Sequence, residues 1–180
     1  RLGELLHLEW QDFDWERIFS VERARWLHTG GIFTALGERT PEVAVRACEV
    51  ARRHGTVVSY DLNYRDSLWK GIGGQSKAQA VNRALVRQVD VLFGNEEDFS
   101  TALGFEVEGT RGDYSNLSIE SFQRMIERVV REYPNVKTIA STLRTAKSAT
   151  VNGWGALAYS EGQFFVVPQT DVEVFDRVGG

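Results

Sequence analysis

Cysteine is nearly absent from this sequence, with Cys48 the only one among 180 residues. No disulfide can therefore form within the chain, and a reduced, cytoplasmic setting fits this composition best. Cys48 lies inside an amphipathic helical pattern, which favours a packing role over a chemical one.

The sequence also has no surplus of positive charge and no long apolar run. Its 21 Lys and Arg residues are scattered among 25 Asp and Glu residues, and the net charge is −4. This distribution is not that of a nucleic-acid-binding surface, so we expect no nucleic acid partner. No apolar run approaches the roughly 20 residues that cross a bilayer, and residues 1–10 lack the order of a signal peptide. We therefore expect no membrane partner and a cytoplasmic location.

Three common ligand-binding motifs are missing as well. The sequence has no Walker-type lysine loop, no Rossmann glycine fingerprint and no cluster of Cys and His. P-loop kinases, ordinary dehydrogenases and zinc enzymes are thus disfavoured. His7, His28 and His54 are isolated, and we interpret each as surface or core filler rather than as a base. No linker, repeat or low-complexity tract divides the chain, so a second complete domain is not expected.

Helical and strand patterns alternate along most of the chain. The patterns predict helices over 40–54 and 76–88 and from Ser118 onward, and strands over 24–29, 56–60, 89–93 and 136–141. Thr40 is expected to cap the first of these helices, with Pro41 at its first position. This alternation predicts an α/β fold with βαβ crossovers and a parallel sheet covered on both faces.

The last third of the chain changes character. Short strand-like runs over 155–159, 163–167 and 172–175 are divided by Glu161-Gly162 and by Pro168. These runs predict a hairpin and one added strand.

Ligands bind beyond the carboxyl ends of strands in open α/β sheets, and the first two such ends carry candidate residues. Gly30-Gly31 follows the first strand and could bring exposed backbone amides close to a ligand, or could simply form a tight turn. Asp61, Asn63 and Arg65 follow the second strand. The guanidinium fork suits a carboxylate or phosphate, although Asp61 and Arg65 could instead form a structural ion pair.

Two further strand ends are also candidates. Gly94-Asn95-Glu96-Glu97-Asp98 places three acids at the start of a helix, where they could cap it or hold Mg²⁺ through water. Asp176-Arg177-Val178-Gly179-Gly180 ends in two glycines whose amides could form an anion cradle.

Five segments in order resemble the PfkB/ribokinase family of carbohydrate kinases, and within it the 2-keto-3-deoxygluconate kinases. They are Trp26–Ile32, Ser59–Arg65 with Leu68-Trp69, Gly94–Asp98, Thr142–Arg144 and Asp176–Gly180. The resemblance implies a ribokinase-like three-layer sandwich with a mostly parallel sheet, and ATP- and Mg²⁺-dependent phosphorylation of the sugar acid at its 6-hydroxyl. Two alternatives stay open: a kinase of a neutral sugar such as fructose or ribose, and a non-catalytic sugar-binding relative.

The resemblance also implies a role for particular residues. It assigns Gly31, Ile32 and Arg65 to the sugar acid, Asn63, Arg65, Asn95 and Thr142 to the nucleotide, and Asp98 with Glu97 to magnesium through water. Position 98 holds Asp where the family has Glu, which shortens the reach of that carboxylate. Residues 144–147 lack the family's usual glycine turn, so adenine contacts are not assigned.

Gly179 and Gly180 would begin the family's anion hole, with the catalytic aspartate expected just after Gly180. Residues 1–180 are therefore expected to form the central part of the kinase domain, without its N-terminal lid or its C-terminal catalytic segment. We expect this chain alone to be inactive and the full-length protein to be a homo-oligomer.

Overall fold

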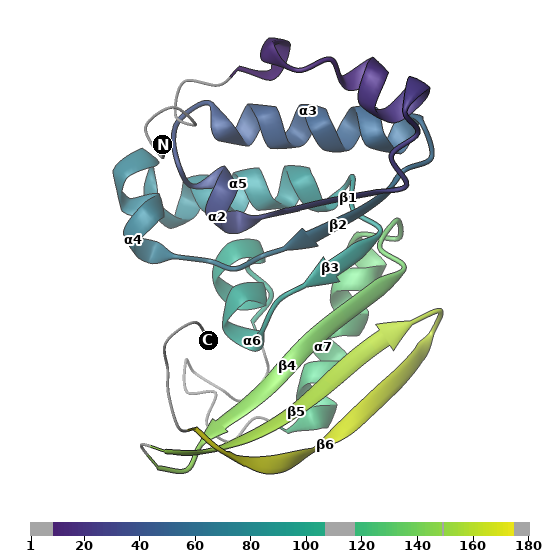
Figure 1. Ribbon diagram of the computed structural model, residues 1–180. Helices are drawn as coiled ribbons and strands as arrows, with labels where there is room; N and C mark the ends of the chain where they lie inside the picture. Colours follow the sequence, from purple (N-terminus) through teal and green to yellow (C-terminus); the bar gives the residue numbers. More distant parts are fainter. Residues whose placement is uncertain (1–8, 107–117, 149, 175–180) are drawn as a thin grey trace.

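Six strands form one sheet in the order β1-β2-β3-β4-β5-β6 in the computed structural model, which describes residues 9–106, 118–148 and 150–174 (Figure 1). The strands are β1 (Trp26–Gly30), β2 (Val57–Asp61), β3 (Val91–Phe93), β4 (Thr138–Ala146), β5 (Val151–Ser160) and β6 (Gln163–Glu173). β1 to β4 pair in parallel, whereas β5 and β6 continue the sheet as antiparallel strands. The predicted α/β class with a mostly parallel sheet is confirmed.

Helices connect the parallel strands. The structure contains η1 (Trp10–Asp12), η2 (Arg17–Val21), α2 (Gly31–Thr34), α3 (Thr40–Arg53), α4 (Asp66–Trp69), η3 (Lys70–Ile72), α5 (Gly74–Val86), α6 (Glu96–Asp98), η4 (Phe99–Leu103) and α7 (Ile119–Glu132). α3, α5 and α7 are the crossovers. The helix predicted from Ser118 onward is α7, and Ser118 is its N-cap, because its side chain accepts from the backbone N–H of Ser121. No helix in the described part of the chain is long and apolar enough to span a membrane.

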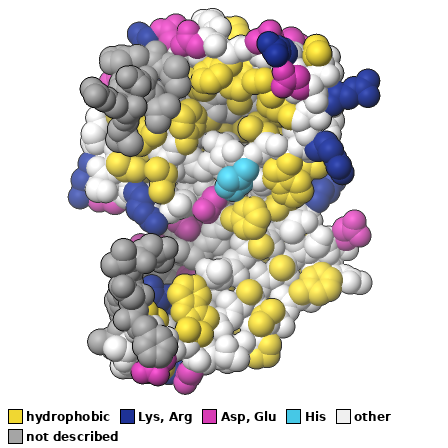
Figure 2. Space-filling model, viewed as in Figure 1, with side chains coloured by type: hydrophobic (Ala, Val, Ile, Leu, Met, Phe, Trp, Pro, Cys, Tyr) yellow, Lys and Arg dark blue, Asp and Glu magenta, His cyan; other side chains and the backbone are white. Residues whose placement is uncertain are grey.

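The three crossover helices lie on one face of the sheet (Figure 1). This follows from strands that neighbour each other in sequence order and from the right-handedness of βαβ crossovers. The core lies on that face and includes fully buried Tyr60, Leu92 and Ile139. The opposite face carries no helix among the described residues, so the predicted cover on both faces is found on one face only in this part of the chain, and Trp26 and Phe165 stay 56% and 54% exposed there. Figure 2 views this second face.

The start of α3 differs by one residue from the sequence prediction. Arg39 is the N-cap residue, so the prediction of Thr40 as the cap is wrong. The Thr40 hydroxyl is held inside the preceding turn, where it accepts from the Gly37 N–H at 3.2 Å and donates to the Gly37 carbonyl at 3.0 Å. Because this hydroxyl is hydrogen-bonded within the turn, it does not cap α3, and Thr40 is instead the first residue of the helix.

The predicted division between 163–167 and 172–175 is also wrong in the described part, because β6 runs unbroken from Gln163 to Glu173. Pro168 is tolerated because β6 is the edge strand of the sheet, where a missing N–H leaves no ladder partner unpaired. The pairing shifts register between Trp154 and Ala156, opposite this proline. Phe175 lies outside the described residues.

Candidate functional site

The parallel strands end at one edge of the sheet, and a cavity opens there on the face without helices. The register aligns Gly30 with Asp61, Asp61 with Phe93, and Phe93 with Ala140, so these strand ends lie side by side. A cavity of about 600 Å³ crosses them. Its lining comes from β1 to β5 and the start of α6: His28, Asp61, Asn63, Phe93, Gly94, Asn95, Asp98, Ala140, Ser141, Thr142, Ala156, Leu157 and Ala158. The fold thus brings predicted residues Asn63, Asn95, Asp98 and Thr142 to one cavity.

Asp61 is a cavity residue to which the sequence assigned no role. Burial raises the pKa of its carboxyl, and neighbouring Asp98 raises it further, while His28 and Arg65 oppose the shift. No ion pair joins Asp61 to Arg65 among the described residues, so the structural ion-pair alternative finds no support there. In Figure 2 a histidine and an acidic side chain lie together in the middle of this face.

Asp98 ties the start of α6 to the loop after β2. One carboxylate oxygen accepts from the Tyr64 N–H at 2.8 Å, and the other accepts from the Asn95 N–H at 3.0 Å. Asn95 returns the contact, because its Oδ1 accepts from the Asp98 N–H at 2.8 Å. Asp98 is only 7% exposed, whereas Glu97 is exposed. No group of three His, Cys, Asp or Glu side chains in the described ranges could hold a metal ion directly.

Arg65 follows the loop after β2 and has no ion-pair partner among the described residues. Its Nη1 donates to the Tyr64 carbonyl at 2.9 Å. The side chain is exposed and does not line the cavity. An exposed guanidinium without a carboxylate partner keeps its donors available for an anion.

Gly31 brings two strand ends into close contact. A Cβ at this position would lie 1.9 Å from the carbonyl oxygen of Leu62, so only glycine fits. Buried polar contacts fix it from the other side, because Thr34 Oγ1 donates to the Gly31 carbonyl at 2.9 Å and lies 3.3 Å from the Tyr60 hydroxyl. Ile32, the next residue of α2, is 41% exposed. The tight-turn interpretation therefore accounts for Gly31 by itself, and its contact with sugar stays a prediction.

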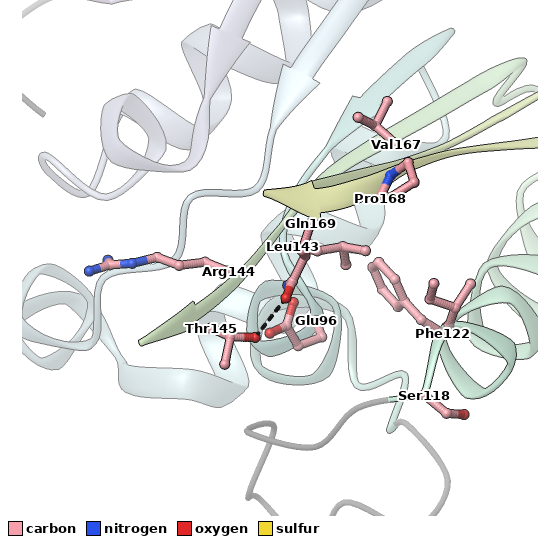
Figure 3. Close-up of a pocket in the computed structure, with 10 residues that line it drawn as sticks. Glu96, Ser118, Phe122, Leu143, Arg144, Thr145, Val167, Pro168 and Gln169 are labelled. Carbon is pink, nitrogen blue, oxygen red and sulfur yellow. Dashed lines mark hydrogen bonds between the residues drawn. The ribbon is translucent and has the colours of Figure 1, made fainter. Parts of the chain in front are cut away.

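A second cavity, of about 370 Å³, is shown in Figure 3. Thr142 lines the first cavity and Leu143 the second, and because successive residues of a strand point to opposite faces, the second cavity lies on the helix side of β4. Phe122 and Leu143 supply apolar walls, while Thr145 Oγ1 donates to Gln169 Oε1 at 3.2 Å. Arg144 points away from the centre of this cavity in Figure 3.

Glu96 gives the second cavity an unusual polar group. Its Oε2 is buried and has no hydrogen-bond partner in the part of the chain that the structure describes. Burial raises the pKa of this carboxyl, and the neighbouring charges of Asp98 and Glu97 raise it further. A buried acceptor without a donor is costly, so this oxygen would gain from a ligand that supplies an N–H or O–H group.

His28 is a cavity residue that the sequence did not predict. His28 was interpreted as filler, yet it lines the first cavity. Period-two alternation puts it on the same face as Gly30, but only the strand register brings that face beside Asp61. Gly179 and Gly180 lie outside the described residues.

Comparison with known proteins finds a matching family and relatives that are sugar kinases. Residues 2–179 match the pfkB family carbohydrate kinase. A 2-dehydro-3-deoxygalactonokinase from Haloferax volcanii is 36% identical over 100 residues, which are 56% of this chain and 29% of that protein. A 5-dehydro-2-deoxygluconokinase from Geobacillus kaustophilus is 34% identical over 140 residues, 76% of this chain and 38% of that protein.

A solved structure is also similar over nearly the whole chain. The 2-dehydro-3-deoxygluconokinase of Thermotoga maritima is 38% identical, with a TM-score of 0.82 over 97% of this chain and 49% of that one. The chain thus spans about half of that enzyme's length, and less of the two relatives above.

Proposed function

This chain belongs to the pfkB family of carbohydrate kinases, and from that premise we propose that the complete protein phosphorylates 2-keto-3-deoxygluconate at its 6-hydroxyl with ATP as donor. By complete protein we mean a longer polypeptide of which residues 1–180 are the central part. One observation carries the proposal, namely 38% identity over 97% of the chain to a 2-dehydro-3-deoxygluconokinase. The residues at the strand ends supply the chemistry that such a reaction needs.

The sugar acid is proposed to bind at the ends of β1 and β2. Gly31 and Ile32 would contact it through the backbone, and Arg65 would receive its carboxylate. The guanidinium of Arg65 has no ion-pair partner among the described residues, which supports this role. Its planar fork of N–H donors matches a carboxylate in two parallel hydrogen bonds. A neutral sugar would leave that fork to the nucleotide phosphates alone.

The nucleotide is proposed to lie along the ends of β2, β3 and β4. Asn63, Arg65, Asn95 and Thr142 would bind its phosphates and ribose, and three of the four line one cavity.

Magnesium is proposed to bind through water near Asp98 and Glu97. Both oxygens of Asp98 already accept backbone N–H groups, so direct coordination would compete with the hydrogen bonds that cap α6. Mg²⁺ usually keeps several waters and takes one or two carboxylates, which fits these residues. When bound, the ion neutralises charge on the phosphates. Asp98 then holds the water shell while fixing the loop at Tyr64.

Proton transfer is proposed to need a group outside this chain. Gly179 and Gly180 would supply amides of the anion hole, and an aspartate following them would take the proton from the attacking hydroxyl. A homo-oligomer is part of the proposal. So is a cytoplasmic location, which fits a sequence whose single cysteine, Cys48, has no partner for a disulfide within the chain.

Steady-state kinetics of the complete protein test the proposal. ADP formation would be followed with 2-keto-3-deoxygluconate, fructose and ribose as acceptors at saturating ATP and Mg²⁺. We expect kcat/KM for the sugar acid to exceed the values for both neutral sugars by at least about a hundredfold, because only the acid pairs with Arg65. A preference for fructose or ribose would overturn the assignment of substrate.

A further inference from the structure

His28 lies in the first cavity but has none of the roles proposed above. Its ring belongs to β1, and its Nδ1 is 2.8 Å from Ser59 Oγ on β2. The ring also meets Phe93 of β3 edge to face, with 6.3 Å between the ring centres. Contacts with two neighbouring strands therefore hold the imidazole in one orientation on the cavity wall.

The hydrogen bonds around Ser59 favour one tautomer of the neutral His28 ring. Ser59 Oγ accepts from Trp26 Nε1 at 2.7 Å, and an indole N–H can only donate. The Ser59 hydroxyl hydrogen then has two acceptors within reach, His28 Nδ1 at 2.8 Å and the Leu27 carbonyl at 3.4 Å. Because the contact to His28 Nδ1 is the shorter of the two, it favours a neutral ring in which Nδ1 accepts and Nε2 carries the hydrogen. No hydrogen bond joins Nε2 to another described residue.

Asp61 offers an acceptor next to this donor. The register pairs His28 with Ser59 and Gly30 with Asp61, which places Asp61 on the same face two residues further along β2. Both side chains line the first cavity. One wall of the cavity thus presents an N–H donor and a carboxylate acceptor side by side.

This pairing suits a hydroxyl better than an anion. A hydroxyl can donate to Asp61 and accept from His28 at the same time, whereas a phosphate or carboxylate at this place would meet the charge of Asp61. We propose that His28 and Asp61 form a hydroxyl-binding pair that recognises one hydroxyl of the sugar substrate, with His28 Nε2–H as its donor and Asp61 as its acceptor. The proposal rests on the proposed function and deepens it by naming specificity residues outside those assigned by family resemblance.

Two amide variants of His28 separate the proposed Nε2–H donor from the contact between Nδ1 and Ser59. His28→Asn keeps a polar atom near the Nδ1 position, where it can still meet Ser59, and loses the donor at the Nε2 position. His28→Gln places an amide near the Nε2 position and restores that donor. Isothermal titration of the complete protein would measure affinity for 2-keto-3-deoxygluconate and, separately, for a non-hydrolysable ATP analogue with Mg²⁺.

We expect His28→Asn to weaken sugar-acid binding about five- to tenfold, the loss of one hydrogen bond. His28→Gln should stay within about threefold of the wild type, and neither variant should change nucleotide affinity. Asp61→Ala should lower sugar-acid affinity by a similar factor. Because both residues would hold one hydroxyl, the His28→Asn/Asp61→Ala double variant should lose less than the product of the two single losses.

The outcomes distinguish this inference from the proposed function. If the wild type binds the nucleotide but no sugar acid, the proposed substrate is wrong, and so is the proposed hydroxyl-binding pair. Wild-type binding that His28→Asn leaves unchanged would overturn the pair alone. Equal loss of sugar-acid and nucleotide affinity in His28→Asn, with a lowered thermal midpoint, would show a structural role and also overturn it.

Discussion

At the scale of single residues, Arg65 is the side chain on which the proposed choice of a sugar acid depends most. We expect Arg65→Lys to weaken sugar-acid binding by about tenfold, because an ammonium keeps the charge but loses the two parallel donors. Binding would be measured by titration calorimetry on the complete protein. Arg131→Lys, at an exposed position of α7, is the matched control and should bind like the wild type. Equal affinities for Arg65→Lys and wild type would argue against a carboxylate at this residue.

Glu96 is expected to make stability depend on pH. Burial raises the pKa of its carboxyl, so the folded state holds the proton more tightly than the unfolded state does. This group therefore costs stability as the pH rises from the unfolded pKa through the raised folded pKa. Glu96→Gln does not titrate and should gain stability relative to the wild type between about pH 4 and about pH 7. Urea unfolding of both proteins at the two pH values checks this, and a constant difference between them would contradict it.

At the scale of elements, the site depends on close contact between the start of α2 and the loop after β2. We expect Gly31→Ala to destabilise the fold by about 1–3 kcal/mol or more, because the added Cβ would meet the Leu62 carbonyl oxygen at 1.9 Å. Gly71→Ala is the matched control, since a Cβ there has nothing within 4 Å. Chemical denaturation of the two variants gives the comparison. A loss no larger than that of the control would mean that the two segments can move apart freely.

The elements themselves were largely readable from the sequence, because short apolar runs followed by Gly or acids mark strand ends. Which strand ends lie side by side was harder to predict from the sequence. Asp61 stood in a segment already singled out, yet its importance depends on the β1–β2 register that puts it beside His28. Thr40 was misplaced by one residue because its hydroxyl is used within the preceding turn.

The second cavity lies beyond sequence reasoning for a related reason. Its polar groups Glu96, Thr145 and Gln169 come from α6, β4 and β6. No local pattern links residues so far apart in the chain. Only the antiparallel return of β5 and β6 against β4 brings Gln169 to Thr145.

At the scale of the whole molecule, this chain is expected to be a binding platform without its proton acceptor. We expect the purified 180-residue chain to transfer no phosphoryl group, because the aspartate of the anion-hole motif would follow Gly180. A coupled assay for ADP with 2-keto-3-deoxygluconate measures this, with the complete protein as the active control. Turnover by the 180-residue chain would refute the need for an outside base.

The sheet face without helices exposes several large apolar side chains. Trp26 of β1 and Phe165 and Val167 of β6 are 56%, 54% and 60% exposed. The relatives found are at least about twice as long as the part this chain matches.

The central claim concerns which bond the complete protein forms. NMR of the product obtained from ATP, Mg²⁺ and 2-keto-3-deoxygluconate tests it most directly, because phosphorus coupling identifies the esterified carbon. The account predicts a single phosphomonoester at the 6-position. A phosphoryl group on another carbon, or no product under conditions in which fructose or ribose is phosphorylated, would contradict it.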